Sequence, residues 1–268
     1  MLSLRQVDIR YSVLDVRRSL LVLLLCLSSR AAAHAWTAYN DLGWTDGQRK
    51  EGITVYTKGE GGKLIDRETG QTLSATLAVA GGSGPNRKFG TNAVAGTDAA
   101  YVFNGVVDCV GCLAYSDEEV MLQIEGLDTQ GRYEVVLYGD RGNRGYARGK
   151  KNARMTKVTL SGADAFANIS SAAAKYSGPD DDSVITTNGF NNELGAVAWF
   201  TLIEPGTDGK ITLTVADGGS KKPPKFYINA IRIRSVPEPA AVLTAGLGLA
   251  LFALGRRRKP RAFRASQP

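Results

Sequence analysis

The fold of this chain is constrained above all by its many short runs of β-branched and aromatic residues, which turn signals separate. Ten runs have this composition: residues 37–40, 53–57, 75–80, 101–106, 120–124, 132–138, 156–160, 196–203, 211–215 and 226–233. In one of them Ile211, Leu213 and Val215 alternate with threonines, so they face one side of a strand. No sustained helical period is present. The sequence therefore predicts an all-β domain, an antiparallel β-sandwich.

The first 35 residues have the pattern of a signal peptide. Arg17-Arg18 supplies positive charge, residues 20–27 are apolar, and Ala33-His34-Ala35 offers the small residues that signal peptidase needs. The apolar run is shorter than the roughly 20 residues of a membrane span. We therefore expect signal peptidase to remove residues 1–35, so that the exported chain begins at Trp36.

A second targeting pattern begins at residue 236. The motif Val236-Pro237-Glu238-Pro239 cannot continue a strand or a helix, because each proline fixes its backbone and lacks a donor. Residues 240–254 are apolar and would form a helix of about 22 Å, which is short for a span but tolerable where flanking cations snorkel. The cluster Arg256, Arg257, Arg258 and Lys259 would stay in the cytoplasm. Residues 236–268 thus predict a transmembrane helix, with residues 36–235 outside the cytoplasm.

These three parts in this order resemble the PEP-CTERM sorting signal. The resemblance implies a protein held in the inner membrane through its C-terminal helix before processing, with an exosortase acting near the Pro-Glu-Pro motif. It also implies delivery to the cell envelope, outer surface or extracellular matrix of a bacterium. The same tail is labelled an ice-binding protein C-terminal domain, and that label concerns the tail alone. The alternative is an ordinary membrane anchor, which also places the domain outside the cytoplasm.

Charge and histidine content exclude several classes of function. The net charge of +7 arises at the two ends, because residues 36–235 hold 22 Lys and Arg against 23 Asp and Glu. A nucleic-acid partner therefore loses its electrostatic support. The only histidine, His34, lies at the expected cleavage site, so the exported chain has none. Its absence excludes Ser-His-Asp and Cys-His catalysis and every metal centre with a histidine ligand.

Two cysteines remain after export, Cys109 and Cys112, spaced as Cys-x-x-Cys. A four-thiolate zinc site would need a second such pair. In an oxidising compartment we expect a disulfide that closes a small turn. Catalytic redox chemistry and two reduced thiols are the alternatives.

The later strands resemble the galactose-binding-like jelly roll of carbohydrate-binding modules. The likeness is carried by Leu127-Asp128, Gly131 and Tyr133-Glu134-Val135 at one strand entry, and by Asp208-Gly209 with the strand from Tyr227 to Ile233 near the end. It implies that the last strand lies beside the N-terminal one. A fold of this kind serves many functions and indicates none by itself.

One internal segment is strongly basic. Residues 140–154 contain six basic residues and one acid. The candidate polysaccharide-binding residues here are Arg141, Arg144, Tyr146, Arg148, Lys150 and Arg154. Guanidinium forks suit carboxylates and sulfates, so the segment predicts a mobile, glycine-rich cradle for an acidic polysaccharide. A solvated connection between strands is the alternative. Trp44, beside the Asp46-Gly47 turn, is the candidate for stacking on a sugar ring.

Acidic clusters offer two further hypotheses. Asp180, Asp181 and Asp182 could bind calcium or form a solvated loop, and no other cofactor is indicated. The favoured function is a non-catalytic envelope or matrix protein that binds or organises extracellular polysaccharide. The alternative is a His-free glycosidase or lyase, for which Asp117-Glu118-Glu119 is the candidate carboxylate source. Glycoside hydrolysis needs two carboxyls roughly 5–10 Å apart across a cleft.

Overall fold

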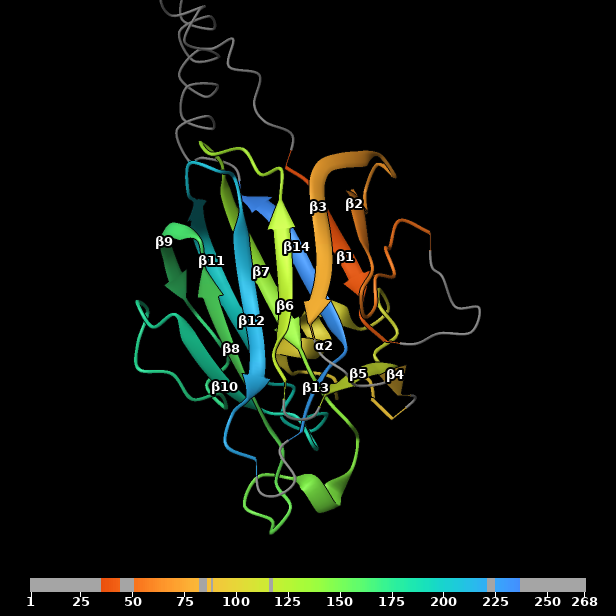
Figure 1. Cartoon of the computed structure of the whole chain (residues 1–268). Helices are drawn as coiled ribbons and strands as arrows, with labels where there is room; N and C mark the ends of the chain where they lie inside the picture. The colour runs from red at the N-terminus through yellow and green to blue at the C-terminus, as the bar shows by residue number, and fades with distance from the viewer. Residues whose placement is uncertain are drawn as a thin grey trace, which may run out of the picture. The chain divides into compact units, whose positions relative to one another are not determined.

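Two antiparallel sheets face each other and enclose the main core, as the computed structural model shows (Figure 1). The structure describes residues 35–43, 51–81, 86–87, 89–115, 118–220 and 225–236. The predicted signal peptide, Trp44, Pro237 to Pro239, the apolar segment and the basic cluster 256–259 lie outside these residues. None of the helices in the described ranges is long and apolar enough to span a membrane.

The strands form two large sheets and one small one, and every strand pair is antiparallel. The five-stranded sheet has the order β1 (Thr37–Asp41), β14 (Ala230–Val236), β7 (Arg132–Tyr138), β11 (Val197–Pro205) and β9 (Ala163–Asn168). The six-stranded sheet has the order β10 (Ser183–Thr187), β8 (Met155–Ser161), β12 (Ile211–Asp217), β6 (Val120–Glu125), β3 (Thr72–Gly81) and β2 (Gly61–Ile65). The small sheet contains β13 (Phe226–Ile228), β5 (Cys112–Tyr115) and β4 (Asn86–Arg87).

Strand alternation places the core between the two large sheets. In β12, Ile211, Leu213 and Val215 are fully buried while the intervening threonines are half-buried, as the sequence predicts. Val135 and Leu137 of β7 join them from the five-stranded sheet. The alternate residues Val136 and Tyr138 of β7 and Ala230 of β14 face the outer side of that sheet. They belong to a second apolar cluster. The five-stranded sheet is therefore covered on both faces over part of its area.

Strand β11 keeps core residues inward on both sides of an irregularity. Its pairing with β7 shifts between Phe200 and Ile203, and Leu202 adopts a positive φ of 51°. The extra residue changes the parity of the strand, so that Phe200 and Ile203 both lie in the main core.

The prediction of a strand over residues 101–106 is wrong, because helix α2 (Asp98–Phe103) occupies this part of the chain. The Thr97 side chain caps the helix by accepting a hydrogen bond from the Ala100 amide. The buried helix residues are Ala99, Val102 and Phe103. In a helix these three apolar side chains are all buried on the outer face of the five-stranded sheet. The stability gained by this burial exceeds the preference of the Tyr-Val-Phe sequence for a strand.

Other boundaries also differ from the predictions. Residues 53–57 form no strand, and Thr54 makes a single bridge with Asn40. The run 226–233 divides at Asn229 into β13 and β14, which belong to different sheets. The strands that the sequence analysis missed are β2, β4, β5, β9 and β10. Several of these are short or rich in alanine, glycine and serine, so they lack the β-branched composition used to find the others.

The first and last described strands lie side by side. Strand β14 pairs with β1, as the jelly-roll resemblance implies. The Trp36 amide donates to the Ser235 Oγ (2.9 Å), and the Ser235 amide donates to the Trp36 carbonyl (3.0 Å). The two ends of the described domain therefore meet at one end of the sandwich.

Candidate functional site

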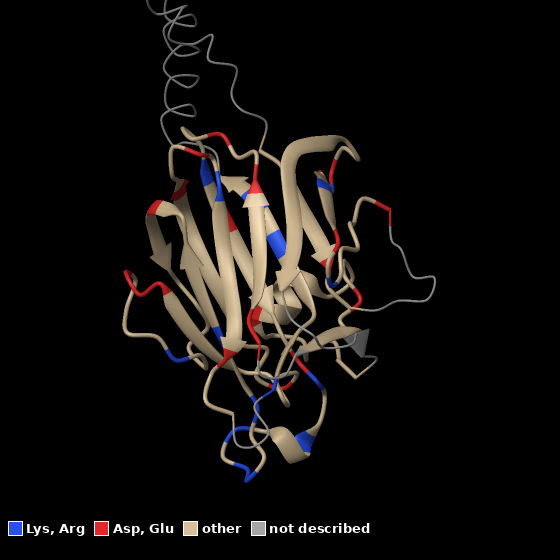
Figure 2. Ribbon diagram, in the orientation of Figure 1, with Lys and Arg blue, Asp and Glu red and all other residues tan. Residues whose placement is uncertain are grey.

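The basic segment connects β7 to β8 at the end of the sandwich opposite those chain ends. Val236 pairs with Arg132, where β7 begins, whereas the segment follows Tyr138, where β7 ends. A strand of seven residues separates the two points by about 23 Å. Figure 2 shows Lys and Arg gathered around this segment at the lower end of the view. We call residues 140–154 the basic loop.

Main-chain hydrogen bonds hold the basic loop in a defined shape. The Arg141 amide donates to the Asn188 carbonyl (2.8 Å), and the Asn188 amide donates to the Arg154 carbonyl (3.1 Å). Between these points the 3₁₀ helix η2 (Arg144–Tyr146) forms a turn. Gly189 lies so close that a Cβ there would come within 2.4 Å of the Tyr146 Cβ. Both ends of the loop and its first turn are therefore bonded to a neighbouring segment, and the mobility of the residues between them stays a prediction.

Two of the six basic side chains are built into the domain. Arg154 is buried (4% exposed), and Arg141 is half-buried. Their guanidinium carbons lie 4.5 Å (Arg141) and 5.0 Å (Arg154) from the centroid of the Tyr146 ring. Cation–π contacts of this kind are worth about 0.5–2 kcal/mol each. Arg141 and Arg154 therefore stabilise the loop as well as adding charge to it.

The other cations of the loop are exposed to solvent. Arg144 forms a 2.8 Å ion pair with Glu193 and lies over the Phe190 ring. Arg148 donates weakly to the Ala173 carbonyl (3.5 Å). In the part of the chain that the structure describes, Arg148, Lys150 and Lys151 have no carboxylate partner. These three side chains are available to an anion in solution.

A network of buried hydrogen bonds holds the first residue of the basic loop, Asp140. Asp140 is fully buried, and its carboxylate accepts hydrogen bonds from the Thr91 hydroxyl and the Asn191 amide (both 2.5 Å). Burial raises the pKa of Asp140, and these hydrogen bonds partly oppose that shift. The Asn229 side chain accepts from the Asp140 amide (2.6 Å) and donates to the carbonyls of Cys109 (2.8 Å) and Gly111 (2.7 Å). This network joins the start of the loop to four other segments.

Sequence reasoning missed the aromatic residues around Arg141. The Tyr227 hydroxyl accepts a hydrogen bond from the Arg141 guanidinium (2.9 Å), and its ring and that of Phe89 both lie 5.4 Å from that group. Tyr227 belongs to a run predicted as core strand, and it is indeed buried. Phe89 is distant in the sequence, so no local signal connects it to the loop.

The two cysteines flank a tight turn below the same network. Cys109 and Cys112 are both buried, and Cys112 begins β5. The Gly111 backbone between them is packed so closely that a Cβ on Gly43 would lie 2.5 Å from its Cα. A disulfide between the two cysteines stays a prediction.

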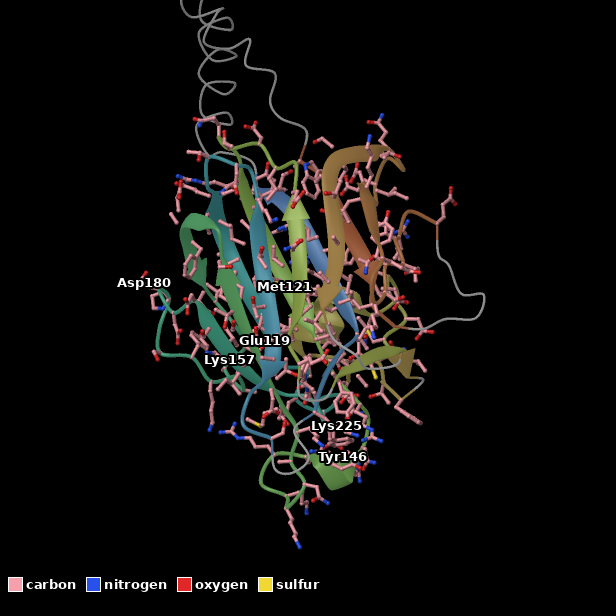
Figure 3. All side chains as sticks on the ribbon, viewed as in Figure 1. Glu119, Met121, Tyr146, Lys157, Asp180 and Lys225 are labelled. Carbon is pink, nitrogen blue, oxygen red and sulfur yellow. The ribbon has the colours of Figure 1, made fainter. Side chains whose placement is uncertain are left out.

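The acidic cluster lies away from the basic loop, and Figure 3 labels Asp180 and Tyr146 on different parts of the surface. The Asp181 carboxylate accepts hydrogen bonds from the amides of Ser177 (2.5 Å) and Ser183 (3.0 Å). Asp182 accepts from the Ser183 hydroxyl (2.8 Å). Within the described ranges no group of three or more His, Cys, Asp or Glu side chains is arranged to hold a metal ion. The cluster shapes its own turn, and the calcium hypothesis gains no support from it.

The turn role of Asp181 predicts a pH-dependent stability. Hydrogen bonds from Ser177 and Ser183 lower the pKa of Asp181, so its ionised form stabilises the folded state. Asp181→Asn should lower the free energy of unfolding by at most about 1 kcal/mol at pH 7. The wild-type advantage should shrink as the pH falls from about 4 toward the lowered pKa. Urea unfolding at pH 7 and pH 3 measures this, with Asp182→Asn as the neighbouring control. An equal gap at both pH values contradicts the assignment.

The carboxylates considered for catalysis are not brought together. Glu118 and Glu119 are exposed, and Asp117 lies outside the described residues. A shallow depression of about 410 Å³ lies beside α2. It is lined by Ala95, Gly96, Thr97, Asp98, Ala100, Tyr101 and Asn104. Its acidic group, Asp98, accepts a hydrogen bond from the Ser171 hydroxyl (2.6 Å). Among the residues that the structure describes, neither region presents a pair of carboxyls across a cleft.

The fold and the chain's targeting pattern define the class of protein, an exported all-β protein. Residues 235–259 match the model of the PEP-CTERM protein-sorting motif. The motif indicates a protein that is exported, anchored in the membrane before sorting, and processed by an exosortase. The match begins at Ser235, so it overlaps the last two residues of β14.

Other comparisons give little. No curated protein matches the chain. Among solved structures, the Bacillus subtilis protein YxiM shares 16% identity at a TM-score of 0.27, over 75% of this chain and 40% of that one. An exo-β-1,3-galactanase from Phanerochaete chrysosporium, solved with galactose, shares 14% identity at a TM-score of 0.23, over 65% of this chain and 36% of that one. This chain spans less than half of either structure, and likenesses at these TM-scores establish neither fold nor function.

Proposed function

We propose that residues 36–236 form a non-catalytic domain that binds acidic extracellular polysaccharide through the basic loop, in a protein sorted to the envelope or matrix. The observation that carries this proposal is the group of exposed cations Arg148, Lys150 and Lys151, which lack carboxylate partners among the described residues. An anionic polymer can bring its charges to all three at once. Carboxylates and sulfates suit such groups.

Contrast with the rest of the domain supports the proposal. Four basic side chains elsewhere are paired with acids: Arg132 with Glu204 (2.7 Å), Lys210 with Glu125 (2.7 Å), and both Arg232 and Arg234 with Glu134. Residues 36–235 are close to neutral overall. The positive charge of the loop is therefore a local feature, which a generally basic composition does not explain.

The loop also lies apart from the end of the domain that carries Val236. Val236 pairs with Arg132 where β7 begins, and the basic loop leaves β7 at its other end. We further propose that the domain is a galactose-binding-like jelly roll. Its two antiparallel sheets and the pairing of β1 with β14 support that assignment.

A charge-removal series tests the proposal. We expect Arg148→Gln, Lys150→Gln and Lys151→Gln together to abolish retention of the 36–236 domain on immobilised polygalacturonate at low salt. Thermal stability should change by less than about 0.5 kcal/mol, because all three side chains are exposed.

The chain offers a matched control with one arginine and two lysines. Lys58, Lys63 and Arg67 are exposed cations in and around the edge strand β2. Changing these three to glutamine removes the same charge and should leave retention nearly intact. Equal losses from both triple variants would show that net charge alone governs retention, and the loop would have no special part in it.

A further inference from the structure

Arg141 differs from the exposed loop cations because it is fixed in place. Its guanidinium donates to the Tyr227 hydroxyl (2.9 Å) and lies over three rings, those of Tyr146 (4.5 Å), Phe89 (5.4 Å) and Tyr227 (5.4 Å). Tyr227 is itself buried in the small sheet. A side chain held in this way loses little conformational entropy when it binds a ligand.

The same guanidinium is half-buried without a carboxylate among the described residues. The neighbouring Asp140 turns its oxygens to Thr91 and Asn191. A charge withdrawn from water is stable when an opposite charge or hydrogen-bond acceptors complement it. A guanidinium has five N–H donors, and Tyr227 uses one of them. The remaining donors can bind an anion.

Phe89 places an apolar surface beside this charge. The residue is 49% exposed, and its ring centroid lies 5.4 Å from the Arg141 guanidinium. An exposed aromatic ring offers a flat surface for the C–H face of a sugar ring. Figure 3 shows Tyr146, the ring on which Arg141 stacks, at the end of the molecule from which the loop projects.

We infer that Arg141 and Phe89 form a subsite for a hexuronate unit, in which the sugar ring packs on Phe89 and its carboxylate binds the Arg141 guanidinium. A uronate carries its carboxylate directly on the sugar ring, so one unit can reach both groups. Arg148, Lys150 and Lys151 supply general attraction, and the subsite selects the chemistry of the polymer. This inference rests on the proposed function, since it names the sugar that the basic loop prefers.

Two anionic polymers distinguish selective binding of uronate units by the subsite from general attraction of anions by the exposed cations. Polygalacturonate carries carboxylates on its rings, and dextran sulfate carries sulfate esters. Phe89→Ala and Arg141→Lys should each weaken binding of the 36–236 domain to polygalacturonate about tenfold, the effect of losing roughly 1.4 kcal/mol. Binding to dextran sulfate should change less than about twofold, because the exposed cations that attract it remain. Arg141→Lys keeps the charge and removes the planar fork.

Tyr101→Ala is the matched control, because Tyr101 is an aromatic residue of α2 that is 83% exposed. It should leave binding to both polymers unchanged. If Phe89→Ala weakens both polymers equally, or neither, the subsite is overturned while the basic loop keeps its proposed function. If the wild-type domain binds neither polymer at low salt, the proposed function fails and the subsite fails with it. Thermal unfolding of each variant confirms that the fold is retained.

Discussion

Replacing Asn229 by alanine is expected to lower the free energy of unfolding by about 3–5 kcal/mol. The side chain is fully buried and makes three hydrogen bonds, which join the Asp140 amide to the carbonyls of Cys109 and Gly111. Alanine leaves all three groups buried without that partner, at about 1–3 kcal/mol each before relaxation. A loss of this size is a large fraction of the stability of a domain.

Chemical denaturation of the 36–236 domain measures this loss. Asn152→Ala is the control, because Asn152 is exposed in the basic loop and should change stability by less than about 0.5 kcal/mol. Asn229→Asp retains an acceptor for the Asp140 amide but loses both donors, so it should be destabilising as well. A change below 1 kcal/mol for Asn229→Ala would show that the three bonded groups do not depend on this side chain.

Shortening the chain by one strand is expected to abolish cooperative folding. Residues 36–236 should unfold in one cooperative transition, because they contain every strand of both large sheets. A chain that ends at Asn229 lacks β14, which pairs with β1 on one side and β7 on the other. It also lacks Ile231 and Ile233, two fully buried core residues. The remaining strands β1 and β7 would then have unpaired backbone groups in the middle of the sheet.

Circular dichroism during urea unfolding distinguishes these two chains. The control is the longer chain 36–268. With both chains in detergent, its urea midpoint of unfolding should equal that of 36–236. A cooperative transition for the chain ending at Asn229, at the same midpoint, would contradict the role given to β14. Failure of the 36–236 chain to fold would instead place the domain boundary beyond Val236.

The fold class could be predicted because strand signals are local. Runs rich in β-branched and aromatic residues marked β6, β7, β8, β11 and β12 within one or two residues of their bounds. The prediction of a strand at 101–106 is wrong because the helix here is stabilised by tertiary burial of Val102 and Phe103. Local strand propensity contains no information about such burial. Strand β9, with the sequence Ala-Asp-Ala-Phe-Ala-Asn, forms by pairing with β11 and has little strand propensity of its own.

The candidate site could be predicted only in part. Charge density alone located the basic loop, and its members Arg148 and Lys150 are exposed. Composition could not separate these from Arg141 and Arg154, which pack on Tyr146. That division depends on contacts with β13 and with the segment after β10, which are distant in the sequence. The contribution of Phe89 is invisible for the same reason.

These contacts also decide which loop residues suit a test of binding by mutation. Removing Arg141 disturbs its hydrogen bond to Tyr227 and its stack on Tyr146, so a binding loss in that variant mixes stability with charge. Arg148, Lys150 and Lys151 avoid this problem, because they are exposed and make few contacts. Variants of these three residues therefore report on binding alone.

The most direct test of the central claim is the affinity of the 36–236 domain for soluble polygalacturonate at two ionic strengths. At about 0.01 M the screening length is about 30 Å, and at about 1 M it is about 3 Å. The account predicts measurable binding at the lower ionic strength, loss of it at the higher one, and no binding at either by the Arg148, Lys150 and Lys151 triple variant. Binding that is unchanged by salt, or that persists in the triple variant, would contradict it.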